Sequence, residues 1–284
     1  MIQYLYLGRV TYEDGLRLQA EIAALRLTGQ VDNVLLLLEH PPVLTLGRNA
    51  NRSNVLASDE LLAKRGVALH EINRGGDVTY HGPGQLVGYP IFDLRSLHND
   101  NGGRLGPVDF VRKMEEALIR VCGAYGVRAG RITGLTGVWC GLDDDCSAGG
   151  SCASIVGRKI GAIGIHVSRG ITSHGFAFNV TTDLRDFQLI NPCGITDRPV
   201  TSLEREVAEP ASLPALEEVA HQAARQFGQV FREQVWAAEN LDALREQAGQ
   251  RGEAATASQP EDTPLRIPPE IERLRGVVSA PVDA

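Results

Sequence analysis

The sequence predicts an α/β or α+β fold, in which helices flank a mixed β-sheet. Segments with strand character precede, separate and follow amphipathic helical segments, and they lack the regular rhythm of a strand–helix–strand repeat. The chain of 284 residues is 43% hydrophobic, so it can bury a substantial core. We therefore expect one sheet with helices packed on it.

Four segments are expected to be helices. Apolar residues recur at helical spacing in residues 12–27 and 107–125. A shorter helix is expected over residues 58–66, where a serine N-cap precedes two acidic residues and a glycine ends the segment. Ser212 and Pro214 open a fourth helix, which has one apolar face.

Six segments have the composition of strands. The fifth is expected to contain a turn near residue 157, and the third leads directly out of a glycine-rich loop. They cover residues 33–39, 67–73, 86–91, 136–140, 155–167 and 171–180.

In the last of these strands, alternation places His174, Phe176 and Phe178 on one face. This aromatic face is expected to belong to the core. The opposite face carries Gly175 and Ala177, whose small side chains are expected to leave room for a narrow apolar substrate.

Charge, cysteine content and the N-terminus exclude several classes of protein. The formal net charge of -7 argues against general nucleic-acid binding. The first seven residues lack the basic region and cleavage site of a signal peptide, and the apolar run 34–38 is too short to span a bilayer. Five cysteines form no small-scaffold spacing, which favours a cytoplasmic protein with reduced thiols.

Residues 1–240 are expected to form a single domain, and residues 250–284 a disordered tail. No aromatic residue follows Trp236, and the chain from Gln250 onward is rich in Ala, Glu, Pro and Arg. Such a segment cannot bury enough apolar surface to offset the entropy lost on ordering.

The most informative segment is the run RGGDVTYHGPGQLVGYP at residues 74–90. Four glycines and a proline fall within its first eleven residues, which suits backbone that bends sharply and lies against a ligand. Six polar side chains are interleaved with them, and an apolar strand follows. The combination is typical of a ligand pocket at a sheet edge; an ordinary hairpin turn is the alternative.

Two further residues are candidates for chemistry. Lys159 is one of only three lysines in the chain and stands between glycines at the start of a strand; a solvated strand-end lysine is the alternative. Cys193 lies on a turn between Pro192 and Gly194, although lone cysteines are commonly buried apolar residues. If the two meet in space, the ammonium stabilises the thiolate and makes it a nucleophile.

Four motifs, in register over about residues 5–205, resemble those of the lipoyl(octanoyl) transferases. They are the run 74–90, GRKIGAIG at 157–164, HGFAFN at 174–179 and PCGI at 192–195. The resemblance implies the fold of the biotin and lipoate protein ligase catalytic domain, a mixed sheet flanked by helices.

The implied activity is transfer of an octanoyl group from octanoyl-acyl carrier protein to a lysine of a lipoyl domain, the first step of endogenous protein lipoylation. The implied acceptors are the lipoyl domains of 2-oxoacid dehydrogenase complexes and the glycine cleavage H protein. No cofactor or metal is expected, nor binding to nucleic acid or membrane. A monomer is the default expectation.

The resemblance also implies a catalytic dyad. Cys193 is the expected nucleophile, which forms an acyl thioester, and Lys159 the residue that lowers its pKa. His81 is expected either to orient the dyad or substrate or to form a structural hydrogen bond to the loop. The substrate-binding residues implied are Arg74, Gly75, Gly76, Asp77, Val78, Thr79, Tyr80, His81, Ala162, Ile163, Gly164, Gly175, Phe176 and Ala177.

One segment departs from the family pattern, and the net charge sets a further requirement. An insertion at residues 141–153 contains Cys146 and Cys152, and we expect a surface hairpin there rather than a metal site, because the spacing is not that of a zinc knuckle. Acyl carrier proteins are acidic, as is this chain, so a local arginine patch is required. Its candidates are Arg48, Arg52, Arg74 and Arg158.

Two other functions share parts of this pattern. An ATP-dependent lipoate or biotin ligase also uses a glycine-rich loop and a lysine, but it needs no nucleophilic cysteine. A non-catalytic module that binds acyl carrier protein would require Cys193 to be inert.

Overall fold

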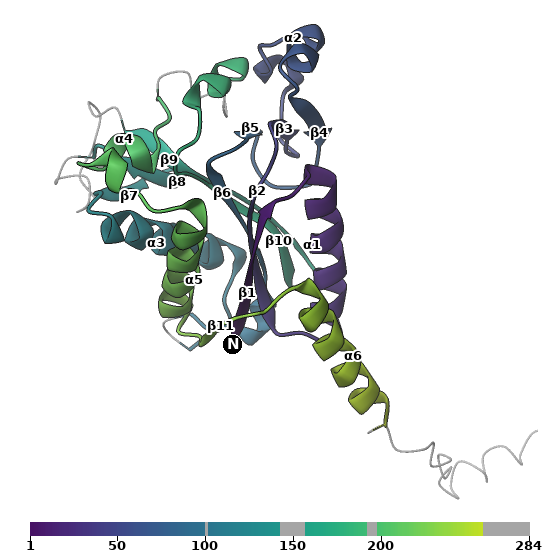
Figure 1. The fold of residues 1–284 in the computed structure, drawn as a ribbon. Coiled ribbons are helices and arrows are strands. Elements are labelled where there is room, and N and C mark those ends of the chain that lie inside the picture. The colour runs from purple at the N-terminus through teal and green to yellow at the C-terminus, as the bar shows by residue number, and fades with distance from the viewer. Residues whose placement is uncertain (100–101, 143–156, 192–197, 258–284) are drawn as a thin grey trace, which may run out of the picture.

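The computed structural model describes residues 1–99, 102–142, 157–191 and 198–257 (Figure 1). Its centre is an eight-stranded mixed sheet in the order β11-β1-β2-β6-β10-β9-β8-β7. The strands β1, β2 and β11 run parallel, and the other pairs are antiparallel. The strands are β1 Ile2–Arg9, β2 Asn33–Glu39, β6 Gln85–Ile91, β7 Ala129–Ile132, β8 Leu135–Cys140, β9 Arg158–Ser168, β10 Ile171–Asn179 and β11 Val235–Ala237.

A second sheet of three short strands carries the glycine-rich loop. Its order is β4-β3-β5, with β4 Ala68–Glu71, β3 Val43–Leu46 and β5 Val78–His81. The α-helices are α1 Tyr12–Leu27, α2 Asp59–Lys64, α3 Pro107–Ala124, α4 Leu203–Glu206, α5 Leu216–Phe231 and α6 Leu241–Ala257. Short 3₁₀ turns are η1 Arg52–Asn54, η2 Leu94–Ser96, η4 Leu184–Leu189 and η6 Pro210–Ser212.

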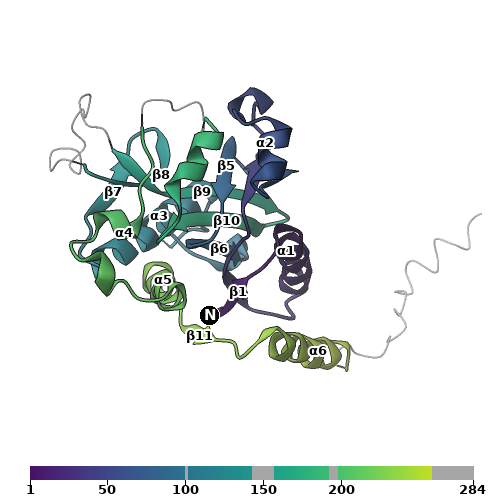
Figure 2. The same ribbon diagram turned by 45° about the horizontal axis from the view of Figure 1, so that its top comes forward.

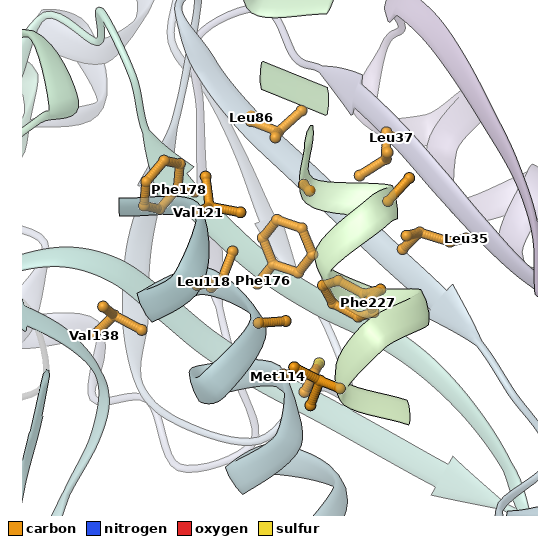
Figure 3. Packing of buried hydrophobic residues seen from close by; sticks show 14 of the residues in the cluster. Leu35, Leu37, Leu86, Met114, Leu118, Val121, Val138, Phe176, Phe178 and Phe227 are labelled. Atoms are coloured by element: carbon orange, nitrogen blue, oxygen red, sulfur yellow. The ribbon is translucent and has the colours of Figure 1, made fainter. Parts of the chain in front are cut away.

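Helices cover both faces of the large sheet, as Figures 1 and 2 show from two directions. On one face, α3 and α5 bury a core that includes Phe110, Phe176 and Phe227 (Figure 3). On the other face, α1 and α6 pack over a second core that contains Ile22 and Leu244. The predicted fold class, a mixed sheet flanked by helices, is confirmed. No helix in the described part of the chain is both long and apolar enough to cross a membrane.

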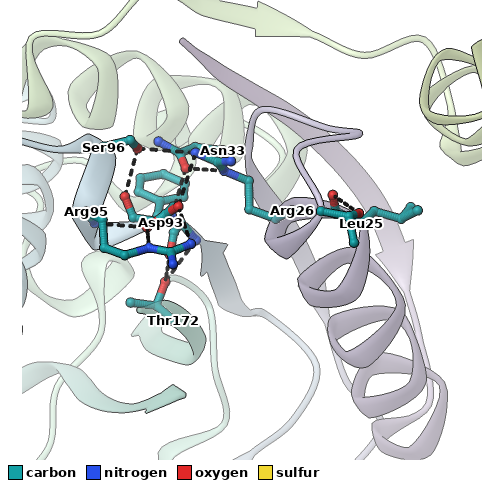
Figure 4. Close-up of polar contacts among 9 residues, drawn as sticks. Leu25, Arg26, Asn33, Asp93, Arg95, Ser96 and Thr172 are labelled. Atoms are coloured by element: carbon teal, nitrogen blue, oxygen red, sulfur yellow. Dashed lines mark hydrogen bonds and ion pairs between the residues drawn. The ribbon is translucent and has the colours of Figure 1, made fainter. Parts of the chain in front are cut away.

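A polar network ties the strands together at the end of β6 that lies away from Gln85 (Figure 4). The side chain of Asn33 accepts hydrogen bonds from Arg26 Nε and from the backbone N–H of Asp93, each at 2.9 Å. Arg95 binds the Asp93 carboxylate at 2.8 Å and holds its pKa below the usual range. These contacts join α1, β2 and the segment that follows β6.

Most expected elements are confirmed, with two differences. The strand expected from residue 155 begins at Arg158 and runs unbroken to Ser168, and the expected turn near residue 157 falls at the border of residues 143–156, which lie outside the described part of the chain. Helix α6 extends to Ala257, beyond the expected start of the tail at Gln250, and Arg251 binds Asp32 at 2.9 Å. Residues 258–284 lie outside the described part of the chain, so the tail stays a prediction.

Candidate active site

A cavity of about 520 Å³ lies between the glycine-rich loop, β9 and β10. Its size falls within the range of about 300–1,000 Å³ typical of small-molecule sites. The expected residues that line it are Arg74, Gly75, Gly76, Asp77, Val78, Thr79, His81, Lys159, Ala162, Ile163, Gly164, Gly175, Phe176 and Ala177. The structure therefore brings three distant segments of the sequence together around one space.

The glycine-rich loop can lie on β9 because β8 stops pairing there. The last residue of β9 that pairs with β8 is Gly161, opposite Val138. Beyond it, the Gly75 N–H donates to the carbonyl of Ile165 at 3.0 Å. A Cβ atom at Gly164 would lie 2.6 Å from the Gly75 carbonyl oxygen, so only glycine permits this close approach.

Arg74 lines the cavity and also makes a structural contact, whereas Tyr80 is not among the residues that line it. The Arg74 guanidinium is buried and bonds the Thr45 carbonyl at 2.7 Å, so it fastens the loop to β3. Tyr80 faces away from the cavity, and its hydroxyl donates to Asp186 at 2.8 Å. Alternation along β5 explains this, since Thr79 and His81 line the cavity and the residue between them points to the opposite face.

Three of the four arginines expected to form a patch, Arg52, Arg74 and Arg158, are engaged by neighbouring groups of the described chain. Arg74 is buried, as described above. Arg52 is paired with Asp59 at 2.5 Å and Arg158 with Glu206 at 2.8 Å, so both charges are already neutralised by neighbours.

Strand β10 also departs from the simple alternation expected for it. His174 has a φ of +56°, in the left-handed region, and lines the cavity instead of joining the aromatic core. A Cβ atom at Gly175 would lie 2.1 Å from the Gly88 carbonyl oxygen. The glycine at 175 is therefore required by close packing against β6. Of the two small residues expected to leave room for a substrate, Ala177 is the one whose size is not explained by this contact.

A chain of hydrogen bonds crosses the polar wall of the cavity to the backbone of Lys159. His81 Nδ1 lies 2.8 Å from the Gln85 side-chain oxygen, and the Gln85 amide donates to Asn179 Oδ1 at 2.9 Å. Asn179 donates to the carbonyl of Thr201 at 2.9 Å, and the Thr201 N–H bonds the Lys159 carbonyl at 2.9 Å. His81 thus makes a structural hydrogen bond within the glycine-rich run, to Gln85, which is one of the two alternatives expected for it.

Three histidines at or near the cavity are held neutral. Burial lowers the pKa of His40 and of His174 to about 4 each. Burial, with smaller contributions that include His40, lowers the pKa of His81 to about 3. His40 has a defined tautomer, because Nδ1–H donates to the Val10 carbonyl at 2.7 Å and Nε2 faces the Tyr89 hydroxyl at 2.7 Å.

Because these histidines are neutral when folded, we expect the free energy of unfolding to fall on acidification. Their folded-state pKa values lie below the unfolded value of about 6.5, so below that pH the unfolded chain binds protons that the folded chain excludes. We expect constant stability above about pH 7.5 and a loss of about 1.4 kcal/mol per pH unit for each imidazole between pH 6 and 4. Urea unfolding as a function of pH measures it.

In His40→Gln, the free energy of unfolding should fall less steeply between pH 6 and 4, by the contribution of one imidazole. The same change at the exposed His98 should leave this pH dependence unaltered. An unchanged slope in His40→Gln would show that this imidazole is charged in the folded protein.

Lys159 is fixed at the cavity wall through its backbone. Its N–H donates to the Pro199 carbonyl at 2.9 Å, and it pairs with Val200 as an isolated parallel bridge. Cys193 lies outside the described residues. On the N-terminal side of the undescribed segment, Asn191 N–H donates to the Asn54 carbonyl at 2.7 Å. Phe187, before this segment, and Val200, after it, both line the cavity.

Several residues that line the cavity were not expected there from the sequence. Gln85 was expected as one of the six polar side chains of the glycine-rich run but without a role of its own, and strand alternation in β6 could have placed Tyr89 beside it. Tyr12 at the start of α1 and Val111 on α3 carry no local signal, because only the packing of the helices on the sheet brings them there. The lining residues without a predicted role include Tyr12, Gln85, Val87, Tyr89, Val111, Gly134, Leu135, Thr136, His174 and Asn179.

Comparison with known proteins decides the family. The model of the lipoyl protein ligase A/B catalytic domain matches residues 11–228. A protein of Acidobacterium capsulatum named octanoyltransferase is 60% identical over 250 residues, which cover 87% of this chain and 98% of that protein. The chain belongs to the octanoyltransferases of this family. They are acyltransferases, so the protein is an enzyme of that class, as the motifs predicted.

Further relatives and solved structures agree with this assignment. The octanoyltransferase of Koribacter versatilis is 48% identical over 274 residues, which cover 96% of this chain and 97% of that protein. Two structures share the fold of this octanoyltransferase family member at 17% sequence identity. They are a bi-partite lipoate protein ligase from Thermoplasma acidophilum (TM-score 0.61, 88% and 91% of the two chains) and lipoate-protein ligase A bound with ATP (TM-score 0.60, 88% and 94%).

Proposed function

We propose that the protein moves an octanoyl group from octanoyl-acyl carrier protein to a lysine of a lipoyl domain, through a thioester on Cys193. The observation that supports this most is the cavity itself. Its floor is apolar where Ala162 and Ala177 lie opposite each other in register, and Lys159 stands at its wall. A linear saturated chain matches a floor built from small and branched apolar residues.

The first half-reaction is thioester exchange. The Cys193 thiolate attacks the carbonyl carbon of the octanoyl thioester, a new C–S bond forms, and the carrier thiolate leaves. The Lys159 ammonium stabilises the Cys193 thiolate before attack. Backbone N–H groups near residues 76–79 or Gly194 are proposed to bind the oxyanion.

The second half-reaction forms the amide. The amine of the acceptor lysine attacks the octanoyl-Cys193 carbonyl, the C–N bond forms, and the Cys193 thiolate is released. Lys159, neutral after giving its proton to the carrier thiolate, takes the proton that the amine loses. Protons balance over the cycle, and no ATP is consumed because a thioester is converted into an amide.

The proposed donor is octanoyl-acyl carrier protein. The proposed acceptors are the lipoyl domains of 2-oxoacid dehydrogenase complexes and the glycine cleavage H protein. We propose a monomer that acts in the cytoplasm, as the cysteine spacing of the sequence favours.

The competing ligase mechanism can be separated in one assay. With a purified lipoyl domain, we expect octanoylation from octanoyl-acyl carrier protein without ATP and none from free octanoate with ATP. Modification that requires free octanoate and ATP would contradict the proposal. Inert behaviour of Cys193 toward iodoacetamide would instead favour a non-catalytic binding module.

Filling the apolar floor should change the preferred chain length. Ala162→Leu adds three carbons to the floor of the cavity, so octanoyl transfer should fall relative to butanoyl transfer by about 10-fold or more, as one or two displaced methylene groups predict. Competition between the two acyl carrier proteins measures the ratio. Ala63→Leu on the exposed face of α2 is the matched control. An unaltered ratio in Ala162→Leu would place the acyl chain elsewhere.

A further inference from the structure

The side chain of Lys159 lies against the indole ring of Trp139 on the neighbouring strand β8. Lys159 Nζ is 4.7 Å from the ring centroid, within the distance of about 6 Å at which a cation is attracted to an aromatic face. Trp139 is 1% exposed, so water screens this attraction little.

A tryptophan at position 139 is unfavourable for stability in one respect. Its Nε1–H is buried and has no hydrogen-bond partner among the described residues. A buried indole N–H is usually bonded, and leaving it unpaired costs about 1–3 kcal/mol. A phenylalanine would fill most of the same space without this cost. What the indole adds is the ring face that attracts cations most strongly.

The backbone next to Trp139 is shaped to leave room for the lysine. Gly137 has a φ of +128°, and a Cβ atom there would lie 2.6 Å from the Gly161 carbonyl oxygen and 3.2 Å from Lys159 Cε. The buried carboxylate of Glu115 accepts a hydrogen bond from the Gly137 N–H at 2.9 Å and fixes this conformation. The stem of Lys159 therefore passes between Gly137 and the indole.

Other charges surround the same position. The Arg198 guanidinium carbon lies 6.0 Å from the Trp139 ring centroid, so the indole faces two cations. Asp77 and His81 line the same cavity as Lys159, Glu115 is bound by Arg112 and Arg131, and Arg158 lies next to Glu206. The last two neutralise each other at 2.8 Å.

We propose that Trp139 is a positioning residue, whose indole face holds the side chain of Lys159 at the cavity wall and stabilises its ammonium form. This inference rests on the proposed function in one respect, the use of that ammonium to stabilise the Cys193 thiolate. The contact itself can be tested without any activity.

The scarcity of lysine makes a direct test possible. Protein labelled with ¹³C at lysine Cε gives three signals, from Lys64, Lys113 and Lys159, and Lys159→Met assigns the third. The Lys159 methylene protons should be shifted upfield by the indole ring current. In Trp139→Leu this shift should disappear and the titration midpoint of Lys159 should fall by about 0.5–1 pH unit, as a cation–aromatic contact of that strength predicts. The other two signals are internal controls.

Trp139→Phe keeps the protein packed should the leucine variant fail to fold. It should show a smaller upfield shift and a smaller fall of the midpoint, together with a pH profile of kcat/KM displaced in the same direction. A Lys159 signal with the same shift and midpoint in the wild type and in either variant would overturn the proposal. Full transfer activity in Lys159→Met, with the ring-current shift present in the wild type, would overturn the role of the lysine in transfer and leave the contact established.

Discussion

Lys159→Met lowers octanoyl transfer by about 10²- to 10⁴-fold, the range expected when a proton-transfer group is removed. Methionine keeps the length and most of the volume of the side chain and removes its charge, so the fold should persist. Without the ammonium, the Cys193 thiolate loses its stabilising partner, and alkylation of Cys193 should require a higher pH. The rate of iodoacetamide labelling as a function of pH, read at the peptide that contains Cys193, measures this.

Lys113→Met is the matched control for this change. Lys113 lies on α3, where its ammonium donates to the Val230 carbonyl at 3.3 Å, and it does not line the cavity. Its substitution should leave both transfer and alkylation unchanged. An alkylation profile in Lys159→Met that coincides with that of the wild type would refute the dyad.

Glu115→Ala destabilises the fold by about 2–4 kcal/mol, one of the largest effects expected of a single side chain away from the hydrophobic core. The Glu115 side chain is fully buried, and it accepts hydrogen bonds from Arg112 at 2.7 Å, Arg131 at 3.1 Å and the Gly137 N–H at 2.9 Å. Truncation leaves the buried N–H unpaired. Both arginines are partly exposed and can be hydrated, which keeps the loss below that of a wholly buried ion pair.

Glu116→Ala provides the comparison on the next residue of α3. Its carboxylate is partly exposed and binds Arg120 and Arg131 at 2.9 Å each, so its removal should cost no more than about 1 kcal/mol. Urea unfolding of both variants measures the difference. Equal and small losses would show that Glu115 does not organise the β7–β8 hairpin beside Lys159.

The elements with strong local signals were predictable from the sequence. The apolar spacing of α1 and α3, the serine cap of α2 and the apolar run of β2 each specify their own element. Helix α6 was missed because its composition is polar. Among residues 241–254, whose burial the structure describes, Leu244 and Ala248 are the buried ones, and contacts such as Arg245 with Glu21 hold the helix to α1.

The sequence predicted which segments form the site better than it predicted which of their side chains point into the cavity. The glycine-rich run correctly indicated a cavity because several of its glycines are required by close backbone contact. Whether an individual side chain enters the cavity depends on long-range packing. Arg74 is drawn to Thr45 on β3, and the left-handed backbone at His174 turns that side chain out of the core, neither of which has a local signal.

The most direct test of the proposed mechanism is the intact mass of the protein after incubation with octanoyl-acyl carrier protein in the absence of acceptor. We expect the mass to increase by one octanoyl group, the increase to be absent in Cys193→Ser, and the group to be released when a lipoyl domain is added. Transfer to the lipoyl domain without any adduct, or an adduct that persists in Cys193→Ser, would contradict the covalent route through Cys193.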